Sequence, residues 1–140
     1  MKFTTHKRVR FQHCDPAGIV FYPQFYVLLH EVQEDFLAHI GFPEHRLIEA
    51  GYGVPIVDMK TQFISMCRNG DTVHISLVLT HIGNASIGMR YCIQRNDKIA
   101  LQATGVVVYS QLSDGKPVRL PDGLRKAMQP YLEASPQETP

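Results

Sequence analysis

The sequence predicts an α+β protein in which an antiparallel sheet is covered on one face by helices. One stretch near the N-terminus repeats apolar residues with the period of a long helix. Most of the remaining chain has the pattern of strands, joined by short turns rather than by further long helices. No internal repeat and no low-complexity linker divides the chain. The pattern therefore describes one domain of the order strand, long helix, antiparallel strands.

The long helix is predicted over residues 23–40. Pro23 suits the first turn, where its missing N–H would be unpaired in any case, and Gly41 is a typical stop in the left-handed conformation. Polar residues are expected outside the apolar stripe, at Gln24, Glu31, Gln33, Glu34 and Asp35. The stripe that should face the sheet consists of Phe25, Leu28, Leu29, Val32, Phe36, Leu37 and Ile40.

The predicted strands are 3–11, 54–66, 72–82, 86–95 and 98–112. Alternation in the first of them should put Phe3, Val9 and Phe11 on one face. The last is the richest in β-branched residues and is expected to be central in the sheet. Short helices are expected at 43–51 and 121–132.

Composition is that of an ordinary globular domain, with 140 residues, 44% apolar residues and a net charge of +1. Such a charge gives no reason to expect nucleic acid or an anionic membrane as partner, and no run is apolar enough for a membrane helix. The N-terminus lacks the apolar run of a signal peptide, and the three scattered cysteines favour a reducing cytoplasm. We expect one domain over 1–134 and a flexible C-terminal tail at 135–140.

Asp15 begins the turn Asp15-Pro16-Ala17-Gly18, a few residues before the long helix. These residue types match a type I turn, which is a purely structural explanation. The same turn would hold a carboxylate beside a helix N-terminus, whose unpaired N–H groups can bind an oxyanion. A carboxylate beside oxyanion donors is half of an acyl-transfer site. The two interpretations are compatible.

Other reactive side chains are weaker candidates. His30 is expected to be a helix-flank histidine with a hydrogen-bond partner rather than a catalytic base. His13, two residues before Asp15, could reach the substrate. Cys14 is expected to be a small buried residue rather than a nucleophile. The histidines and cysteines show no zinc spacing, so we expect no metal and no cofactor.

The stretch from Phe11 to Phe25 resembles the signature of the 4-hydroxybenzoyl-CoA thioesterase family, whose members have the hotdog fold. Asp15, Gly18, Val20, Phe21 and Tyr22 fit the family pattern directly. The sequence VPIV at 54–57 and Gly70-Asp71 resemble the family's second strand and the following turn. The order of elements fits the fold to about residue 132.

The resemblance implies a sheet wrapped around one long central helix, and a dimer whose two sheets join into one. It implies a homo-oligomer, a dimer of dimers (homotetramer), with active sites at the subunit interface. Asp15 would be the nucleophile or general base, and the Tyr22 backbone N–H would bind the thioester carbonyl oxygen. The substrate would be bound by His13, Gly18, Val20, Phe21 and Phe25, and by Ile56, Asp58, Met59 and Thr61 of the partner subunit's second strand.

The sequence departs from the family at several positions. His30 stands where an acidic residue is usual, and Gln24 stands where asparagine is common. The turn at 82–86 lacks the basic cluster that some relatives use for CoA phosphates. Arg90, Arg95 and Lys98 are possible substitutes.

The function predicted from these residues is that of a cytoplasmic acyl-CoA thioesterase. It would release the free acid and CoA, with aromatic acyl groups such as 4-hydroxybenzoyl favoured, or short-chain ones. Two alternatives stay open: a hotdog dehydratase or hydratase, which needs a histidine paired with a carboxylate, and a non-catalytic acyl-CoA-binding module.

Overall fold

The computed structural model describes residues 1–134, so the predicted tail at 135–140 lies outside the described residues. A five-stranded antiparallel sheet runs in the order β1-β4-β5-β6-β3. A two-stranded ribbon pairs β2 with β7. The strands are β1 (Phe3–Arg8), β2 (Tyr52–Gly53), β3 (Ile56–Phe63), β4 (Thr72–Ile82), β5 (Ser86–Arg95), β6 (Lys98–Val108) and β7 (Ser110–Gln111).

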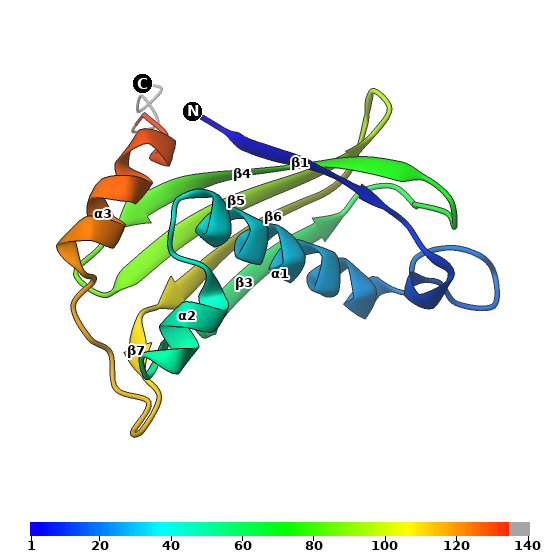
Figure 1. Ribbon diagram of the computed structural model, residues 1–140. Helices are drawn as coiled ribbons and strands as arrows, with labels where there is room; N and C mark the ends of the chain where they lie inside the picture. The colour runs from blue at the N-terminus through cyan, green and yellow to red at the C-terminus, as the bar shows by residue number, and fades with distance from the viewer. Residues whose placement is uncertain (135–140) are drawn as a thin grey trace.

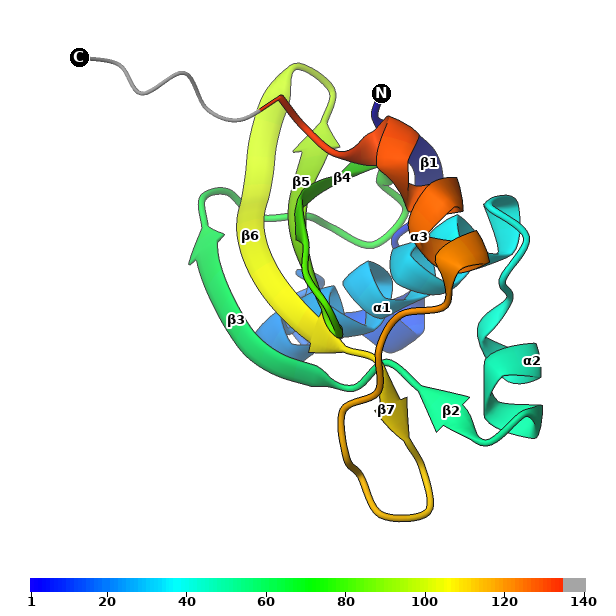
Figure 2. The same ribbon diagram turned by 90° about the vertical axis from the view of Figure 1, so that its left-hand side faces the viewer.

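The helices are of very different lengths. The longest is α1 (Tyr22–His39), followed by α3 (Asp122–Met128) and α2 (Glu44–Glu49). Two short 3-10 turns, η1 (Phe11–His13) and η2 (Gln129–Tyr131), complete the set. Figures 1 and 2 show α1 lying along the concave side of the curved sheet, with α2 and α3 on the same side.

The predicted strands β4 and β5 have the predicted bounds, and the turn between β5 and β6 is built on Asn96 with a φ of 55°. Two predicted strands are divided or shortened. The run 98–112 ends its main pairing at Val108 and re-forms as β7, and the run 54–66 begins after Pro55, which has no N–H to donate. β6 is an interior strand, paired with β5 and β3, although β5 is the middle strand.

The prediction for the first strand is wrong at its end. β1 stops at Arg8, and Phe11, expected on the same strand face as Phe3 and Val9, is 83% exposed in η1. The cause is local: the ring Nδ1 of His13 accepts the backbone N–H of Arg10 at 2.9 Å. This bond competes with an extended backbone and turns the chain into a 3-10 turn.

The core lies between α1 and the inner face of the sheet. The predicted stripe of α1 is buried from Phe25 to Leu37, and Ile40 is half-buried. Across from it the inner residues of β4, namely Val73, Ile75, Leu77 and Leu79, are fully buried. Each such side chain stabilises the fold by about 1.5–3 kcal/mol relative to an exposed one. At the far end of α1, Phe36 packs on Tyr131 with ring centroids 5.0 Å apart.

The expectation that Gln33 lies outside the apolar stripe of the helix is also wrong, because only 4% of this residue is exposed. Gln33 is four residues from both Leu29 and Leu37, so it lies on the apolar stripe itself. A glutamine at a core-facing helical position is unusual, since buried polar groups need partners.

The outer edge of the sheet is β3, which pairs with β6 on one side and with no described strand on the other. Its exposed side chains include Ile56, Val57 and Phe63. Next to Phe63, the rings of Tyr22 and Tyr26 are also exposed and lie 6.1 and 6.2 Å from it. An apolar edge strand is a template for pairing with another chain.

Candidate active site

The loop over residues 10–21 is held in place by its own backbone. Cys14 and Val20 form an antiparallel bridge, and the N–H of Phe21 donates to the carbonyl of His13 at 2.9 Å. A second layer of bonds ties the loop to the segment before β4, where the N–H of Val20 donates to the carbonyl of Cys67 at 2.9 Å. The loop is therefore a fixed platform at the start of α1.

Asp15 sits at the tip of this loop. The Gly18 N–H donates to the Asp15 carbonyl at 2.9 Å, which closes the predicted turn, and Gly18 adopts a φ of 79°. One carboxylate oxygen, Oδ1, accepts the N–H of Ala17 at 2.8 Å. The side chain is half-buried. These bonds fix the carboxylate, and Oδ2 has no hydrogen bond among those of residues 1–134.

The backbone around Tyr22 leaves one amide free. The N–H of Phe21 is used by His13, Pro23 has none, and the N–H of Gln24 donates to the Phe21 carbonyl at 2.8 Å. No backbone bond of the described residues uses the N–H of Tyr22. Tyr22 is the first residue of α1, so this N–H lies at the positive end of the helix dipole. It has the position that an oxyanion donor needs.

His13 and Cys14 both have structural partners. His13 is 3% exposed, and its Nδ1 holds the Arg10 N–H, so this ring is part of the loop's scaffold. Desolvation raises the pKa of the Cys14 thiol, and the nearby carboxylates of Asp15 and Asp71 raise it further. A thiol with a raised pKa is a poor nucleophile. This agrees with the expectation that Cys14 is not the reactive group.

A cavity of about 550 Å³ lies between α1, α2 and the chain leading into β3. Its walls are mainly apolar, and they come from segments far apart in the sequence. The apolar wall is formed by Leu29, Ile48, Val54, Pro55, Ile56 and Met59. Tyr26 and Leu112 also contact the cavity. A mostly apolar concave site of this size suits a small, mainly apolar ligand.

Besides Tyr26, four residues with polar side chains line this cavity. Gln33 and Tyr91 are buried, with 4% and 2% exposed. His30 and Glu44 lie where the cavity approaches solvent, His30 being half-exposed. Desolvation raises the pKa of the Tyr91 hydroxyl, which stays protonated at neutral pH.

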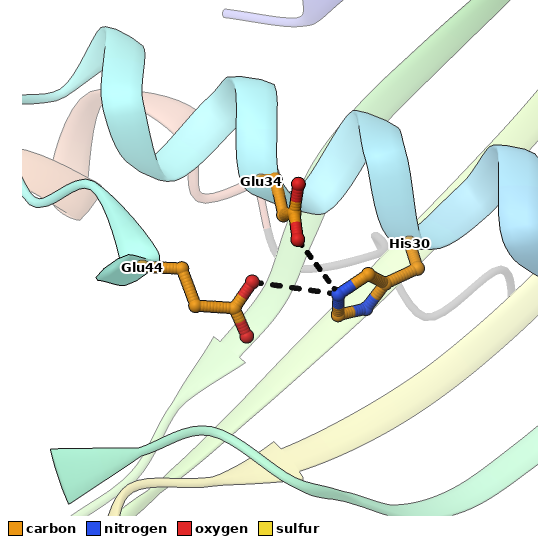
Figure 3. Close-up of side chains that lie close together, drawn as sticks. All are labelled: His30, Glu34 and Glu44. Carbon is orange, nitrogen blue, oxygen red and sulfur yellow. Dashed lines mark hydrogen bonds and ion pairs between the residues drawn. The ribbon is translucent and has the colours of Figure 1, made fainter. Parts of the chain in front are cut away.

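His30 lies between two carboxylates. Figure 3 shows its Nε2 pointing to Glu34 of the next helical turn, at 3.1 Å, and to Glu44 of α2, at 3.4 Å. Burial raises the pKa of Glu44, a hydrogen bond with Glu34 adds to the rise, and His30 opposes it. The expectation that His30 is a helix-flank residue with a hydrogen-bond partner is confirmed.

This His30–Glu34–Glu44 cluster is also the group in residues 1–134 that could hold a metal ion, since its ligand atoms lie within 4.8 Å of one another. Spacing in the sequence could not reveal it, because Glu44 comes from a separate helix. His30 and Glu34 are about half exposed and form an ion pair, whereas Oε2 of Glu44, 3.4 Å from Nε2 of His30, is buried and has no hydrogen-bond partner among residues 1–134. The expected absence of a metal stays a prediction.

The structure divides the predicted site residues into two groups. Asp15, Gly18, Val20, Phe21, Tyr22 and Phe25 lie in the loop and the first turn of α1, together with His13. Ile56 and Met59 line the cavity, whereas Asp58 is exposed and Thr61 accepts a hydrogen bond from the Tyr26 hydroxyl at 2.9 Å. Asp15 is not among the residues that line this cavity.

Sequence reasoning did not find most of the cavity. The residues it missed include Gln33, Glu44 and Tyr91. The one signal available was Gln33, a polar residue at a stripe position of a helix. The others converge only in the folded chain.

The proposed phosphate-binding arginines are already in ion pairs. Arg90 Nη1 binds the carboxylate of Glu133 with one contact of 2.7 Å, and Arg95 Nη1 lies 3.4 Å from Asp71. Lys98 is exposed in the turn at the start of β6.

Comparison with known proteins identifies the family. The model of the family described as thioesterase-like superfamily matches residues 9–128, most of the chain. The chain belongs to the thioesterase-like superfamily. The predicted relationship and the prediction of a thioester hydrolase are thereby confirmed. The loop with Asp15 and most of the cavity lie within the matched residues.

The names of several relatives of this thioesterase give an aromatic CoA ester as the substrate. The chain is 26% identical over 124 residues to the 4-hydroxybenzoyl-CoA thioesterase of Pseudomonas sp. (strain CBS-3), covering 83% of this chain and 87% of that protein. It is 24% identical over 135 residues to the 1,4-dihydroxy-2-naphthoyl-CoA hydrolase of Thermosynechococcus vestitus, covering 94% and 89%. The solved structure of a gentisyl-coenzyme A thioesterase superimposes with a TM-score of 0.84 at 28% identity, covering 90% and 99%.

These structural likenesses confirm the predicted α+β hotdog fold. Among the described residues, no helix has the length and apolar character needed to cross a membrane.

Proposed function

We propose that this thioesterase hydrolyses an aromatic acyl-CoA to the free acid and CoA, with Asp15 and the Tyr22 N–H as the reacting groups. The observation that carries the proposal is the free N–H of Tyr22, at the start of α1, directly after the loop that holds Asp15. The same backbone ladder fixes the Asp15 turn and the start of α1, and the Ala17 N–H holds the Asp15 carboxylate within that turn.

The chemistry needs few groups. The Tyr22 N–H polarises the thioester carbonyl by binding its oxygen as negative charge develops there. Asp15 either attacks the carbonyl carbon, giving a mixed anhydride that water then hydrolyses, or accepts a proton from an attacking water. On both routes the C–S bond breaks and CoA leaves as a thiolate, which takes up a proton.

The aromatic acyl group is supported by the cavity and by the relatives. The relatives named above act on hydroxybenzoyl, dihydroxynaphthoyl and gentisyl esters of CoA. In this chain the cavity is walled by apolar side chains such as Leu29, Val54 and Met59 and is larger than a single ring requires.

The complete site is proposed to combine two subunits. The helical rise from Tyr22 to Gln33 is about 16 Å, more than one aromatic ring spans. An antiparallel pairing of β3 with β3 of a second copy would lay the Ile56 end of one strand beside the Phe63 end of the other. The ring of Phe63 packs against Tyr22. Such a pairing would bring one chain's cavity to the other chain's Asp15 loop and cover the apolar edge.

The sheet wrapped around one central helix, a dimer of dimers and a cytoplasmic location belong to the same proposal. The location is supported by three free cysteines, Cys14, Cys67 and Cys92. No cofactor is required by the chemistry described.

The test is release of the CoA thiol from a panel of benzoyl, hydroxybenzoyl, phenylacetyl, short-chain and long-chain CoA esters, with wild type and Asp15→Asn side by side. We expect wild type to favour an aromatic ester and the variant to lose at least about 10³-fold in kcat while its melting temperature stays near that of wild type. Equal release by both proteins would remove Asp15 from the chemistry. Binding of esters without release would favour the binding module.

One observation favours a second function. His30 and Glu44 form a histidine–carboxylate pair at the cavity, which is the requirement of a hydratase or dehydratase. Adding an α,β-unsaturated acyl-CoA to the panel and following its absorbance separates the two reactions. Hydration without thiol release would support this alternative.

A further inference from the structure

Gln33 is a buried polar residue with too few partners. It lies on the core-facing side of α1 between Leu29 and Leu37, and only 4% of it is exposed. Its one side-chain hydrogen bond in the described chain comes from the Tyr91 hydroxyl to Oε1, at 3.4 Å. This is longer than the usual 2.5–3.0 Å for two oxygens. The Tyr91 hydroxyl lies closer to the sulfur of Met89, at 3.1 Å.

The amide of Gln33 therefore keeps most of its hydrogen-bonding capacity. A side-chain amide offers two N–H donors and two acceptor sites. Turning the amide by half a rotation exchanges its nitrogen and oxygen, and in either orientation one polar end has no partner in residues 1–134. No Gln33 atom is among the fully enclosed side-chain atoms of residues 1–134 that lack a partner, so water or a ligand in the cavity can reach the unpaired end and satisfy it.

The unsatisfied end faces the cavity, because Gln33 and Tyr91 both line it. The neighbouring wall is apolar, with Leu29, Val54 and Met59. Of the other polar residues that line the cavity, Tyr26 donates its hydroxyl to Thr61, and His30 contacts Glu44, whose Oε2 has no hydrogen-bond partner among residues 1–134. The cavity is thus an apolar slot with one buried, neutral, hydrogen-bonding end.

We propose that Gln33 and Tyr91 form the distal end of the acyl pocket and select acyl groups that carry a neutral hydroxyl at the end remote from the thioester. This inference rests on the proposed function. A phenolic hydroxyl donates and accepts, so it matches the amide in either orientation and the Tyr91 hydroxyl as well. An unsubstituted ring displaces water from Gln33 and replaces none of its hydrogen bonds. A carboxylate would bring a charge into an apolar slot beside Glu44.

The experiment compares kcat/KM for 4-hydroxybenzoyl-CoA and benzoyl-CoA in wild type, Gln33→Leu and Tyr91→Phe. Leucine has a similar size and no polar group, so the Gln33→Leu variant should keep a melting temperature close to that of wild type. The control is Gln94→Leu, an exposed glutamine of β5 outside the cavity. We expect wild type and the control to prefer the hydroxylated ester by at least about tenfold, and Gln33→Leu to lose most of that preference.

Binding of the free acids gives a readout that needs no turnover. In calorimetric titrations, 4-hydroxybenzoate should bind wild type more tightly than benzoate does, and Gln33→Leu should bind both alike. A preference that survives both substitutions, or that wild type lacks, would overturn the inference. Failure of wild type to hydrolyse any aromatic ester would instead overturn the proposed function, while the binding difference would still test Gln33.

Discussion

The loop at residues 10–21 and the cavity beneath α1 are held together by different forces. In the loop, backbone hydrogen bonds connect residues close in sequence, such as Gly18 to Asp15 and Phe21 to His13. In the cavity, side chains from α1, α2, β3 and β5 meet without such a ladder. The proposed reacting groups are thus fixed by local bonds, whereas the shape of the proposed acyl pocket depends on how whole elements pack. Substitutions in the two regions should therefore have different effects on kcat and on substrate choice.

After Asp15→Asn, the largest effect should come from removing the free N–H at the start of α1. Tyr22→Pro deletes this donor, and the preceding residue Phe21 already has the extended conformation, with ψ of 127°, that proline requires before it. Tyr22→Ala is the matched control, since it removes the ring and keeps the N–H. We expect kcat to fall about 10²–10³-fold in Tyr22→Pro relative to Tyr22→Ala. Similar rates in the two variants would mean that the side chain, not the backbone, acts.

A mixing experiment tests whether the loop and the cavity of one site come from different chains. Asp15→Asn removes the carboxylate, and Ile48→Trp should fill the cavity from exposed α2 without touching the loop. Each variant alone should be nearly inactive. After subunit exchange in an equal mixture, roughly a quarter of the sites would pair an intact Asp15 with an intact cavity, so about that share of activity should return.

No recovery after verified exchange would contradict the shared site, because a site within one chain would always carry one of the two defects. Subunit exchange is checked by mass spectrometry with one variant isotopically labelled.

The smallest expected effect is a change in thermal stability that comes from Glu44, which lies where the cavity approaches solvent. Burial raises the pKa of Glu44 in the folded protein above its ordinary value of 4.5. The folded state is therefore penalised once Glu44 ionises, and this loss of stability grows as pH rises through the folded pKa. Glu44→Gln should melt about 1–2 °C above wild type near pH 7.5, and the difference should vanish below about pH 4. Glu49→Gln, an exposed residue of the same helix, should show no such trend.

The sequence was most informative where structure is local. The bounds of β4 and β5, the start of α1 near Pro23 and the turn after Asp15 all follow from short-range patterns. The errors arose where a side chain competes with the backbone or a residue type disagrees with its position. The His13 ring accepts a hydrogen bond from the Arg10 N–H, and β1 therefore ends earlier than predicted. Gln33 is buried on a helix stripe that otherwise carries apolar residues.

By itself the sequence determined the α+β class, the family and the loop that carries Asp15, because periodicity and turn chemistry act between residues only a few positions apart. Only the tertiary structure decided which side chains line the cavity. Gln33, Glu44 and Tyr91 are separated by up to 58 positions and come together because α1 and α2 pack over the sheet. Their meeting depends on long-range packing, which no local pattern encodes.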